Sequence, residues 1–280
     1  MKRLIKAVRA VAAAVYTVIH IFTITALGFL LEGVYCAVMS RGDWAAFRNR
    51  FTWHTLGHGY LLFKILCSIL GVQAHFRFPR SVDVSKLFGS FIVVGNHQSL
   101  IDTLIMCVVL WLAKQTRARW VLKREVWWVL PIALAAFVTN CAFVKREKGS
   151  GDLEAVEDCA ADAYRDRAHL LIFPEGGRFK GADVTSLRQF TKLPRTGGWG
   201  VALKNMPTAS VLALTIRWGG AKAGQPFGRT LWEAAFAFVG NTLDVVVEYI
   251  PREEVDADPE WLMHYWDKIE QRLATWEDVT

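Results

Sequence analysis

The start of the chain is dominated by a long uncharged run. Four cations, Lys2, Arg3, Lys6 and Arg9, precede a stretch from Ala10 to Leu31 that has no acidic or basic side chain other than one neutral histidine. As a helix these residues would extend about 33 Å, close to the hydrocarbon thickness of a bilayer. No small-residue cleavage site follows the run, so it predicts a retained membrane anchor rather than a secretory signal.

A second apolar segment runs from Phe51 to Val72 and is interrupted by His54, His58 and Lys64. These polar positions predict a helix that is interfacial or half-buried rather than fully spanning. We therefore expect residues 1–75 to form two membrane-anchoring helices. The two histidines are four apart and share a helix face, as a metal pair requires, but no third ligand is close in the sequence. A polar helix face is the favoured interpretation, with no metal site.

From Phe91 onward, short apolar or β-branched runs alternate with amphipathic stretches, which is the pattern of a layered α/β domain over residues 76–280. The predicted strands are Phe91–Gly95, Trp120–Leu122, Phe143–Lys145, Leu170–Phe173, Val211–Ile216 and Val245–Ile250. The predicted helices are Leu100–Lys114, Leu153–Arg165 and Pro259–Trp276. The last helix carries Asp258 as its N-cap and places Trp261, Tyr265, Ile269, Leu273 and Trp276 on one face.

A third uncharged run, Val126–Val144, has the length of a membrane span but contains Pro131 and Asn140. It also lies between two segments that carry candidate chemistry, and a crossing would separate them on opposite sides of the bilayer. We therefore expect a buried or membrane-facing helix of the domain.

Composition and charge narrow the class of protein. The chain of 280 residues is 53% hydrophobic and 21% charged, with a mean hydropathy of +0.24. A disordered chain is excluded, and an ordinary soluble enzyme is disfavoured. The net charge of +7 together with twelve tryptophans points to an anionic membrane surface. Nucleic acid is not the expected partner, because the sequence contains neither a Lys/Arg tract nor an RNA-binding signature.

The five cysteines are scattered and never spaced as C-x-x-C. Their odd number and spacing argue against a disulfide framework or a zinc ribbon. Reduced, mostly buried thiols in a protein that faces the cytosol are the expected state.

The first candidate for chemistry directly follows the predicted strand Phe91–Gly95. It is the stretch Asn96–Asp102, which contains His97. A histidine on the loop and an aspartate one turn into the next helix can meet, so that Asp102 holds one imidazole nitrogen and the other accepts a proton from a hydroxyl. By itself the spacing is weak evidence, because a helix-capping aspartate near a structural histidine gives the same pattern.

Two further candidates follow later in the chain. Phe173–Arg178 ends a predicted strand, and its Gly176 and Gly177 allow backbone amides to approach a ligand, while Arg178 offers a fork that matches phosphate oxygens. Lys192–Gly198 is a turn with two cations and a hydroxyl. Taken separately, a glycine turn and a basic surface loop explain these two stretches equally well or better.

The ordered set of motifs resembles the glycerolipid acyltransferase family, that is, the 1-acyl-glycerol-3-phosphate and related lysophospholipid acyltransferases. The resemblance covers about residues 90–220. It rests on N-H-x-x-x-x-D at Asn96–Asp102, K-x-E at Lys123–Glu125 followed by Pro131, F-[IV]-x-R at Phe143–Arg146, F-P-E-G-x-R at Phe173–Arg178, P-R-T-x-G within Leu193–Gly198, and the hydrophobic block Val211–Ile216.

The chain departs from the family pattern in two places. Gly177 stands where the family usually has threonine, and the family's glycines after the proline are not found around Ala133 and Asn140. These departures affect the acyl-chain preference and the acceptor pocket, not the reaction class.

The resemblance implies a layered α/β domain with a mixed sheet flanked by helices, and an enzyme that acylates the sn-2 hydroxyl of lysophosphatidic acid to give phosphatidic acid. It makes His97 and Asp102 the catalytic pair. The acceptor is expected to be bound by Asn96, Lys123, Arg146, Glu175, Gly176, Gly177, Arg178 and Arg195. The acyl donor is acyl-CoA or acyl-carrier protein, and no metal or other cofactor is expected, because a thioester is already activated.

Two alternatives remain open at this point. One is a remodelling acyltransferase that accepts lysophospholipids with larger headgroups. The other is a non-catalytic membrane-surface protein that binds anionic lipid through basic loops and tryptophans. In every case we expect the membrane's cytosolic face, which is the inner membrane in a bacterium.

Overall fold

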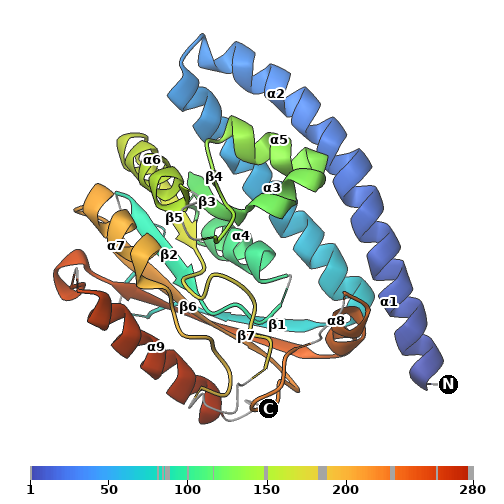
Figure 1. The fold of residues 1–280 in the computed structure, drawn as a ribbon. Coiled ribbons are helices and arrows are strands. Elements are labelled where there is room, and N and C mark those ends of the chain that lie inside the picture. Colours follow the sequence, from blue (N-terminus) through green and yellow to red (C-terminus); the bar gives the residue numbers. More distant parts are fainter. Residues whose placement is uncertain are drawn as a thin grey trace.

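The computed structural model describes residues 2–80, 82–83, 85, 89–99, 101–115, 117–147, 151–181, 188–227, 231–256 and 258–276. Its centre is a seven-stranded sheet in the order β1-β7-β6-β2-β5-β3-β4 (Figure 1). The pairing of β6 with β7 is antiparallel, and the other pairings are parallel, so the sheet is mixed as expected. The strands are β1 (Gln73–Arg77), β2 (Phe91–Gly95), β3 (Ala118–Lys123), β4 (Ala142–Val144), β5 (His169–Ile172), β6 (Ser210–Trp218) and β7 (Thr242–Ile250).

Helices cover both faces of this sheet, because its central strands are apolar on both sides. In β2 every residue is buried: Phe91 and Val93 point into one core, and Ile92 and Val94 into the other. The first core is closed by α1 (Lys2–Ile19), α3 (Trp44–Leu70), α4 (Asp102–Leu112) and α8 (Leu231–Phe238). The second is closed by α6 (Asp152–Arg165), α7 (Thr196–Asn205) and α9 (Pro259–Ala274).

The predicted N-terminal helices form an antiparallel hairpin (Figure 1). α1, the π-helical turn η1 (His20–Thr25) and α2 (Ala26–Ser40) make one continuous helix. Arg41 and Gly42 then adopt positive φ values of 49° and 85°, and Asp43 caps α3 by accepting hydrogen bonds from two backbone amides. Arg3–Ser40 is long and apolar enough to cross a membrane by length and composition, and only 17% of its most apolar window is buried.

The second helix of the hairpin, α3, is the inner one. Its buried side chains, among them Leu56, Phe63 and Leu66, join the first core, where α3 packs on α4. His54 and His58 share one face, as expected, and both contact the Glu32 carboxylate of α2 at 3.2 Å. Among the described residues, no group of histidine, cysteine and carboxylate side chains is arranged to hold a metal ion.

The expectation of one helix through Val126–Val144 was wrong in its extent. The run divides into the 3-10 turn η3 (Arg124–Trp128), α5 (Leu130–Val138) and β4. Pro131 fits only the first turn of a helix, and Asn140, with a φ of 55°, reverses the chain after α5. α5 nevertheless keeps one exposed apolar side, formed by Leu130, Leu134 and Phe137.

The remaining strands and helices match their predicted segments within a few residues. Asp258 caps α9 as predicted, and Tyr265, Ile269 and Leu273 are buried on its inner face. Leu100, where we expected α4 to begin, lies outside the described residues, and α4 begins at Asp102. β1, α7, α8 and the 3-10 turn η4 (Arg252–Glu254) were not predicted.

Candidate active site

The predicted chemical residues gather at the carboxyl ends of four parallel strands. His97 follows β2, Phe173–Arg178 follows β5, Lys123 ends β3, and Arg146 follows β4. Because β2, β5, β3 and β4 are neighbours and parallel, their carboxyl ends share one edge of the sheet, which is where open α/β sheets bind ligands.

His97 and Asp102 form a hydrogen-bonded pair. The Nδ1 atom of His97 lies 3.1 Å from Oδ2 of Asp102. The loop after β2 carries the histidine, and Asp102 is the first residue of α4, so the two side chains meet across the start of the helix, as predicted. This contact makes Nδ1 the protonated nitrogen and leaves Nε2 of His97 as the acceptor, with no bond to any group among the described residues.

The Asp102 carboxylate is fully buried and is surrounded by donors. Its Oδ2 atom also accepts hydrogen bonds from the backbone amides of Gln98 and Ser99, at 2.6 and 2.7 Å. Its Oδ1 atom accepts from the Ser99 hydroxyl at 2.6 Å and from the Trp218 indole at 3.1 Å. A buried carboxylate is costly unless it is bonded in this way, so these donors offset the cost of burying Asp102 and fix its side chain beside His97.

The loop after β5 holds His97 from its other side. The Phe173 ring stacks on the imidazole with centroids 4.2 Å apart, and the Phe179 amide donates to the His97 carbonyl at 2.7 Å. The His97 side chain is 15% exposed. The ring is therefore fixed by Asp102 and Phe173 but still has an accessible edge.

Asn96 does not face the ligand side. It is fully buried, and its amide bonds both backbone groups of Ile216 in β6, accepting from the N–H at 2.7 Å and donating to the carbonyl at 2.8 Å. Both ends of the amide are thus occupied within the protein. Asn96 ties the end of β2 to β6 next to His97, and the acceptor contact that we expected of it stays a prediction.

Glu175 is also interior. Its carboxyl is 1% exposed and accepts a hydrogen bond from the Trp266 indole of α9 at 3.2 Å. Burial raises the pKa of Glu175 well above its usual value of 4.5, although donors including the backbone amides of Lys192 and His97 oppose this shift. Glu175 therefore connects the loop after β5 to α9 and lies beside the Lys192 turn, and its expected contact with an acceptor stays a prediction.

Cations surround the two glycines of this loop. A Cβ atom added at Gly177 would lie 3.2 Å from the Arg146 guanidinium and 4.0 Å from the Lys192 ammonium. One added at Gly176, where φ is 65°, would lie 3.1 Å from the Arg195 side chain. The absence of a side chain at position 177, which departs from the family pattern, leaves the space that Arg146 fills.

The crowding of these cations shifts the pKa values of Arg146 and Lys192. Burial lowers the pKa of Arg146, and the charge of Arg195 lowers it further. Burial likewise lowers the pKa of Lys192, with Arg195 and Lys180 acting in the same direction against an opposing contribution from Glu175. An anion placed among these groups would relieve both effects.

Lys123 and Arg178 are the remaining cations that we expected to bind the acceptor. Lys123 is half-exposed and pairs with Glu125, whose pKa is lowered chiefly by the hydrogen bond from Lys123 and also by the charge of Arg146. Arg178 is partly exposed, and the described residues offer it no hydrogen bond or ion pair.

Sequence reasoning missed the residues that support the site. Trp218 and Trp266 were not recognised, although each buried indole N–H requires an acceptor and so points to a polar partner. Ser99 and Phe173 lay within motifs that we had singled out, but nothing indicated their contacts. Lys192 belonged to a predicted turn without being chosen as a binding residue.

Comparisons with known proteins agree with this geometry. Residues 80–209 match the family model described as Acyltransferase. The chain is 24% identical over 119 residues to human 1-acyl-sn-glycerol-3-phosphate acyltransferase beta, covering 42% of this chain and 40% of that protein. It is 30% identical over 88 residues to 1-acyl-sn-glycerol-3-phosphate acyltransferase alpha of Mus musculus, which covers 31% of this chain and 30% of that protein. The matches thus span less than half of the length of these curated relatives.

The fold has a counterpart among solved structures. The crystal structure of the 1-acyl-sn-glycerophosphate (LPA) acyltransferase PlsC from Thermotoga maritima superposes with a TM-score of 0.62 at 17% identity, over 97% of this chain and 95% of that one. The family model thus identifies residues 80–209 as an Acyltransferase domain, and the matches to curated relatives and the shared fold agree with it.

Proposed function

We propose that the chain transfers a fatty acyl group from acyl-CoA or acyl-carrier protein to the sn-2 hydroxyl of lysophosphatidic acid, which gives phosphatidic acid. The observation that supports this most directly is the His97–Asp102 pair beside a cluster of cations. The pair suits deprotonation of a hydroxyl, and the cations suit a phosphate.

In this proposal Nε2 of His97 accepts the proton of the acceptor hydroxyl while the oxygen attacks the thioester carbonyl. A C–O bond forms, and the carbonyl electron pair moves onto oxygen. When the tetrahedral intermediate collapses, the C–S bond breaks and the sulfur leaves with the proton that His97 returns. Asp102 does not exchange a proton; its negative charge stabilises the imidazolium that exists between the two transfers.

The acceptor phosphate is assigned to the cations around Gly176 and Gly177. Arg146, Lys192 and Arg195 are already crowded there, and a phosphate monoester carries about −1.5 to −2 charges at neutral pH. Arg178 and Lys123 are assigned to the same anion from the partly exposed side. Asn96 and Glu175 act as positioning residues, and the backbone at Gly176 and Gly177 lets the phosphate approach. The reaction requires no cofactor besides the acyl donor.

We further propose that the apolar outer side of the hairpin rests in the cytosolic leaflet, on the side of the acyl donor. The exposed apolar residues of α1 and α2 include Val8, Val15 and Leu30, and Trp128 and Leu134 are exposed on η3 and α5. α5 packs against η1 and α2, so these side chains belong to adjoining surfaces. An acceptor lipid could then reach the sheet edge without leaving the membrane surface.

The test is turnover by the purified full-length protein, followed as release of free thiol and by mass spectrometry of the lipid. We expect phosphatidic acid from lysophosphatidic acid and an acyl thioester. His97→Ala should lower kcat about 10²–10⁴-fold or more, and Asp102→Asn should also impair turnover severely. If no combination of acyl-CoA or acyl-carrier protein with a panel of lysolipids gives turnover, the enzymatic proposal is wrong and a lipid-binding protein is favoured.

The acceptor assignment is tested separately. Arg178→Ala removes a charge-assisted bond to phosphate, worth about 1.5–3 kcal/mol, so kcat/KM for lysophosphatidic acid should fall about ten- to hundredfold. An uncharged monoacylglycerol, if it reacts, should be affected much less. Equal losses on both acceptors would contradict the role of Arg178 in phosphate binding, and faster turnover of lysophospholipids with larger headgroups would favour a remodelling enzyme.

A further inference from the structure

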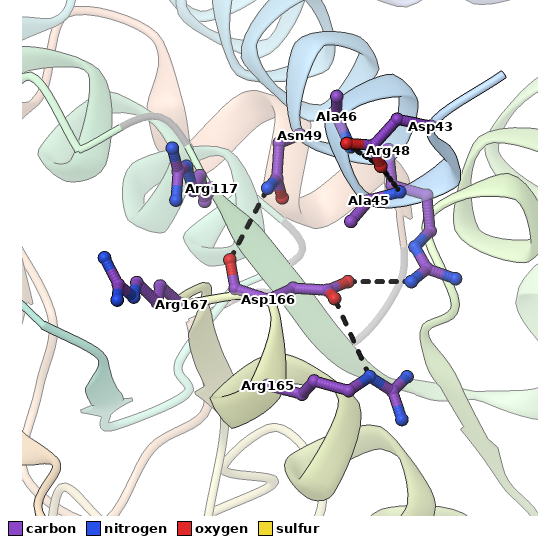
Figure 2. A pocket seen from close by; sticks show the side chains of 9 residues that line it. All are labelled: Asp43, Ala45, Ala46, Arg48, Asn49, Arg117, Arg165, Asp166 and Arg167. Carbon is purple, nitrogen blue, oxygen red and sulfur yellow. Dashed lines mark hydrogen bonds and ion pairs between the residues drawn. The ribbon is translucent and has the colours of Figure 1, made fainter. Parts of the chain in front are cut away.

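A second cluster of cations lies at the opposite edge of the sheet. It lines a surface pocket of about 530 Å³ formed by the start of α3, the segment before β3 and the end of α6 (Figure 2). Arg117 directly precedes β3, and Arg167 precedes β5, so the pocket is at the amino ends of strands whose carboxyl ends carry the candidate active site. None of its lining residues belongs to the acyltransferase motifs.

The pocket is built around the buried Asp166. Its Oδ2 atom lies 2.9 Å from Nη2 of Arg48 and 2.9 Å from Nη2 of the fully buried Arg119, and Arg165 lies 3.9 Å from its other oxygen. Asn49 donates to the Asp166 carbonyl at 3.5 Å. These contacts join the start of α3 to the end of α6 beneath the pocket.

Two arginines on this pocket have no carboxylate partner among the described residues. Arg117 and Arg167 are exposed, and in Figure 2 both lie to the same side of Asp166, away from Arg48 and Arg165. Arg167 directly follows the C-cap of α6 and has a φ of 53°, the left-handed conformation with which helices commonly end.

The charge balance of the pocket favours a dianion. Four arginines and two aspartates line it, and Asp43 is also engaged in capping α3. Two positive charges remain, which matches the charge of about −1.5 to −2 on a phosphate monoester. Arginine forks provide paired N–H donors for phosphate oxygens. The α3 N-terminus contributes little, since Asp43 already accepts from its amides.

We propose that this pocket is a second anion site that binds a phosphate monoester, with Arg117 and Arg167 as its ligands, separate from the acceptor site. The phosphate comes from a lipid headgroup or from a soluble phosphate ester. A lipid source has structural support, because the exposed Trp44 and the exposed apolar end of α2, at Val38 and Met39, adjoin the start of α3. The proposal does not depend on catalysis, because it is tested by binding.

The first experiment is isothermal titration calorimetry of the purified full-length protein with glycerol 3-phosphate and with inorganic phosphate. If both anion sites exist, the wild type binds two equivalents, and the double variant Arg117→Gln/Arg167→Asn keeps one. Asparagine is chosen at position 167 because it tolerates positive φ. If the acceptor site is wrong and the pocket is right, the wild type binds one equivalent and the double variant none, so the two failures are distinguishable.

The matched control is Arg80→Gln/Lys268→Gln, which removes two exposed charges from other parts of the surface. The control should bind as the wild type does, whereas the pocket variant should lose at least about tenfold in affinity at the second site. Unchanged thermal unfolding of the pocket variant will show that it is folded. The proposal is overturned if the pocket variant binds as many equivalents of the phosphate ligand as the wild type does. It is also overturned if the control loses as much affinity as the pocket variant.

The second experiment separates the two sources of phosphate. Flotation with phosphatidylcholine vesicles, with and without phosphatidic acid, measures the additional binding that the phosphomonoester lipid provides. A lipid source predicts that the pocket variant loses this increment while the control retains it. A soluble source predicts the calorimetric loss with no difference in flotation. If the pocket variant loses binding in neither experiment, Arg117 and Arg167 have no ligand and the proposed site is rejected.

Discussion

The Trp218 indole donates a hydrogen bond of 3.1 Å to the same carboxylate that orients His97, although Trp218 and Asp102 are 116 residues apart. Trp218 also packs against Phe227 and Phe238, with ring centroids 5.4 and 4.6 Å away. In our proposal the general base, His97, is therefore positioned through Asp102 by a side chain that contacts neither substrate.

Trp218→Phe should separate this positioning role from packing. The ring is largely kept, but the buried Asp102 loses a donor, which costs about 1.5–3 kcal/mol. We expect a lower unfolding temperature and a reduced kcat, with KM for donor and acceptor nearly unchanged. Trp199→Phe is the control, because Trp199 is fully buried and its indole N–H has no partner among the described residues. Equal kcat values in the two variants would refute the positioning role.

Glu175→Gln should change how stability depends on pH. Because the pKa of Glu175 is raised in the folded protein, the unfolded chain loses this proton at a lower pH than the folded chain does. The stabilisation that the protonated Glu175 carboxyl contributes is therefore fully present below its usual pKa of 4.5. It decreases as the pH rises toward the pKa of the folded protein. Glutamine cannot ionise, so the variant should gain stability relative to the wild type as the pH rises from 4.5 to 7.

The measurement is thermal unfolding across this pH range. Glu157→Gln serves as the control, because Glu157 is exposed and pairs only with Lys204 at 3.5 Å among the described residues. A difference between Glu175→Gln and wild type that stays constant with pH would mean that Glu175 does not carry a raised pKa.

The two glycines of the loop after β5 should respond differently to alanine. Gly176 has a φ of 65°, so alanine there is strained and should cost about 1 kcal/mol or more. At Gly177 the added methyl meets only the flexible ends of Arg146 and Lys192, so stability should be nearly unaffected while KM for lysophosphatidic acid rises. Unfolding temperatures and acceptor KM values measured side by side decide this, and the reverse order of stability would contradict the loop geometry.

A single introduced cysteine can locate the domain relative to the membrane. Lys180 is exposed next to the candidate site, and we expect Lys180→Cys to react with an impermeant maleimide only after intact cells are permeabilised. Burial raises the pKa of Cys107 to about 12 and also raises that of Cys159, so these native thiols should contribute little background. Lys204→Cys, on the far end of α7, should behave identically. Labelling of both positions in intact cells would place the domain on the outer side.

The sequence predicted the elements whose pattern is local. The strands β2, β5, β6 and β7 each contain a short run of mostly apolar residues, and α9 shows its cap and its apolar face at helical spacing. The motif residues His97 and Asp102 could be paired in advance, because only five positions separate them. β1 was missed, since Gln73, His75 and Arg77 give it the polar character of an exposed edge strand.

The supporting contacts could not be predicted, because they join residues that are remote in the sequence. Nothing in the pattern around Asn96 indicates that its amide will bond Ile216, or that Glu175 will meet Trp266 inside the protein. The motif residues at positions 96 and 175 were expected to contact the acceptor, and their contacts inside the protein depend on tertiary packing that a local pattern does not display.

These remote bonds have a consequence for how the protein acquires its site. The segment that matches the family ends at residue 209, whereas Ile216, Trp218 and Trp266 all follow it. A chain cut after residue 209 would contain the histidine, the aspartate and every arginine assigned to the acceptor, yet it would lack the partners that hold Asn96, Asp102 and Glu175. Contacts over such separations close late in folding. During synthesis, therefore, Asn96 and Asp102 lack these remote partners until β6 has been made, and Glu175 lacks its partner until α9 has been made.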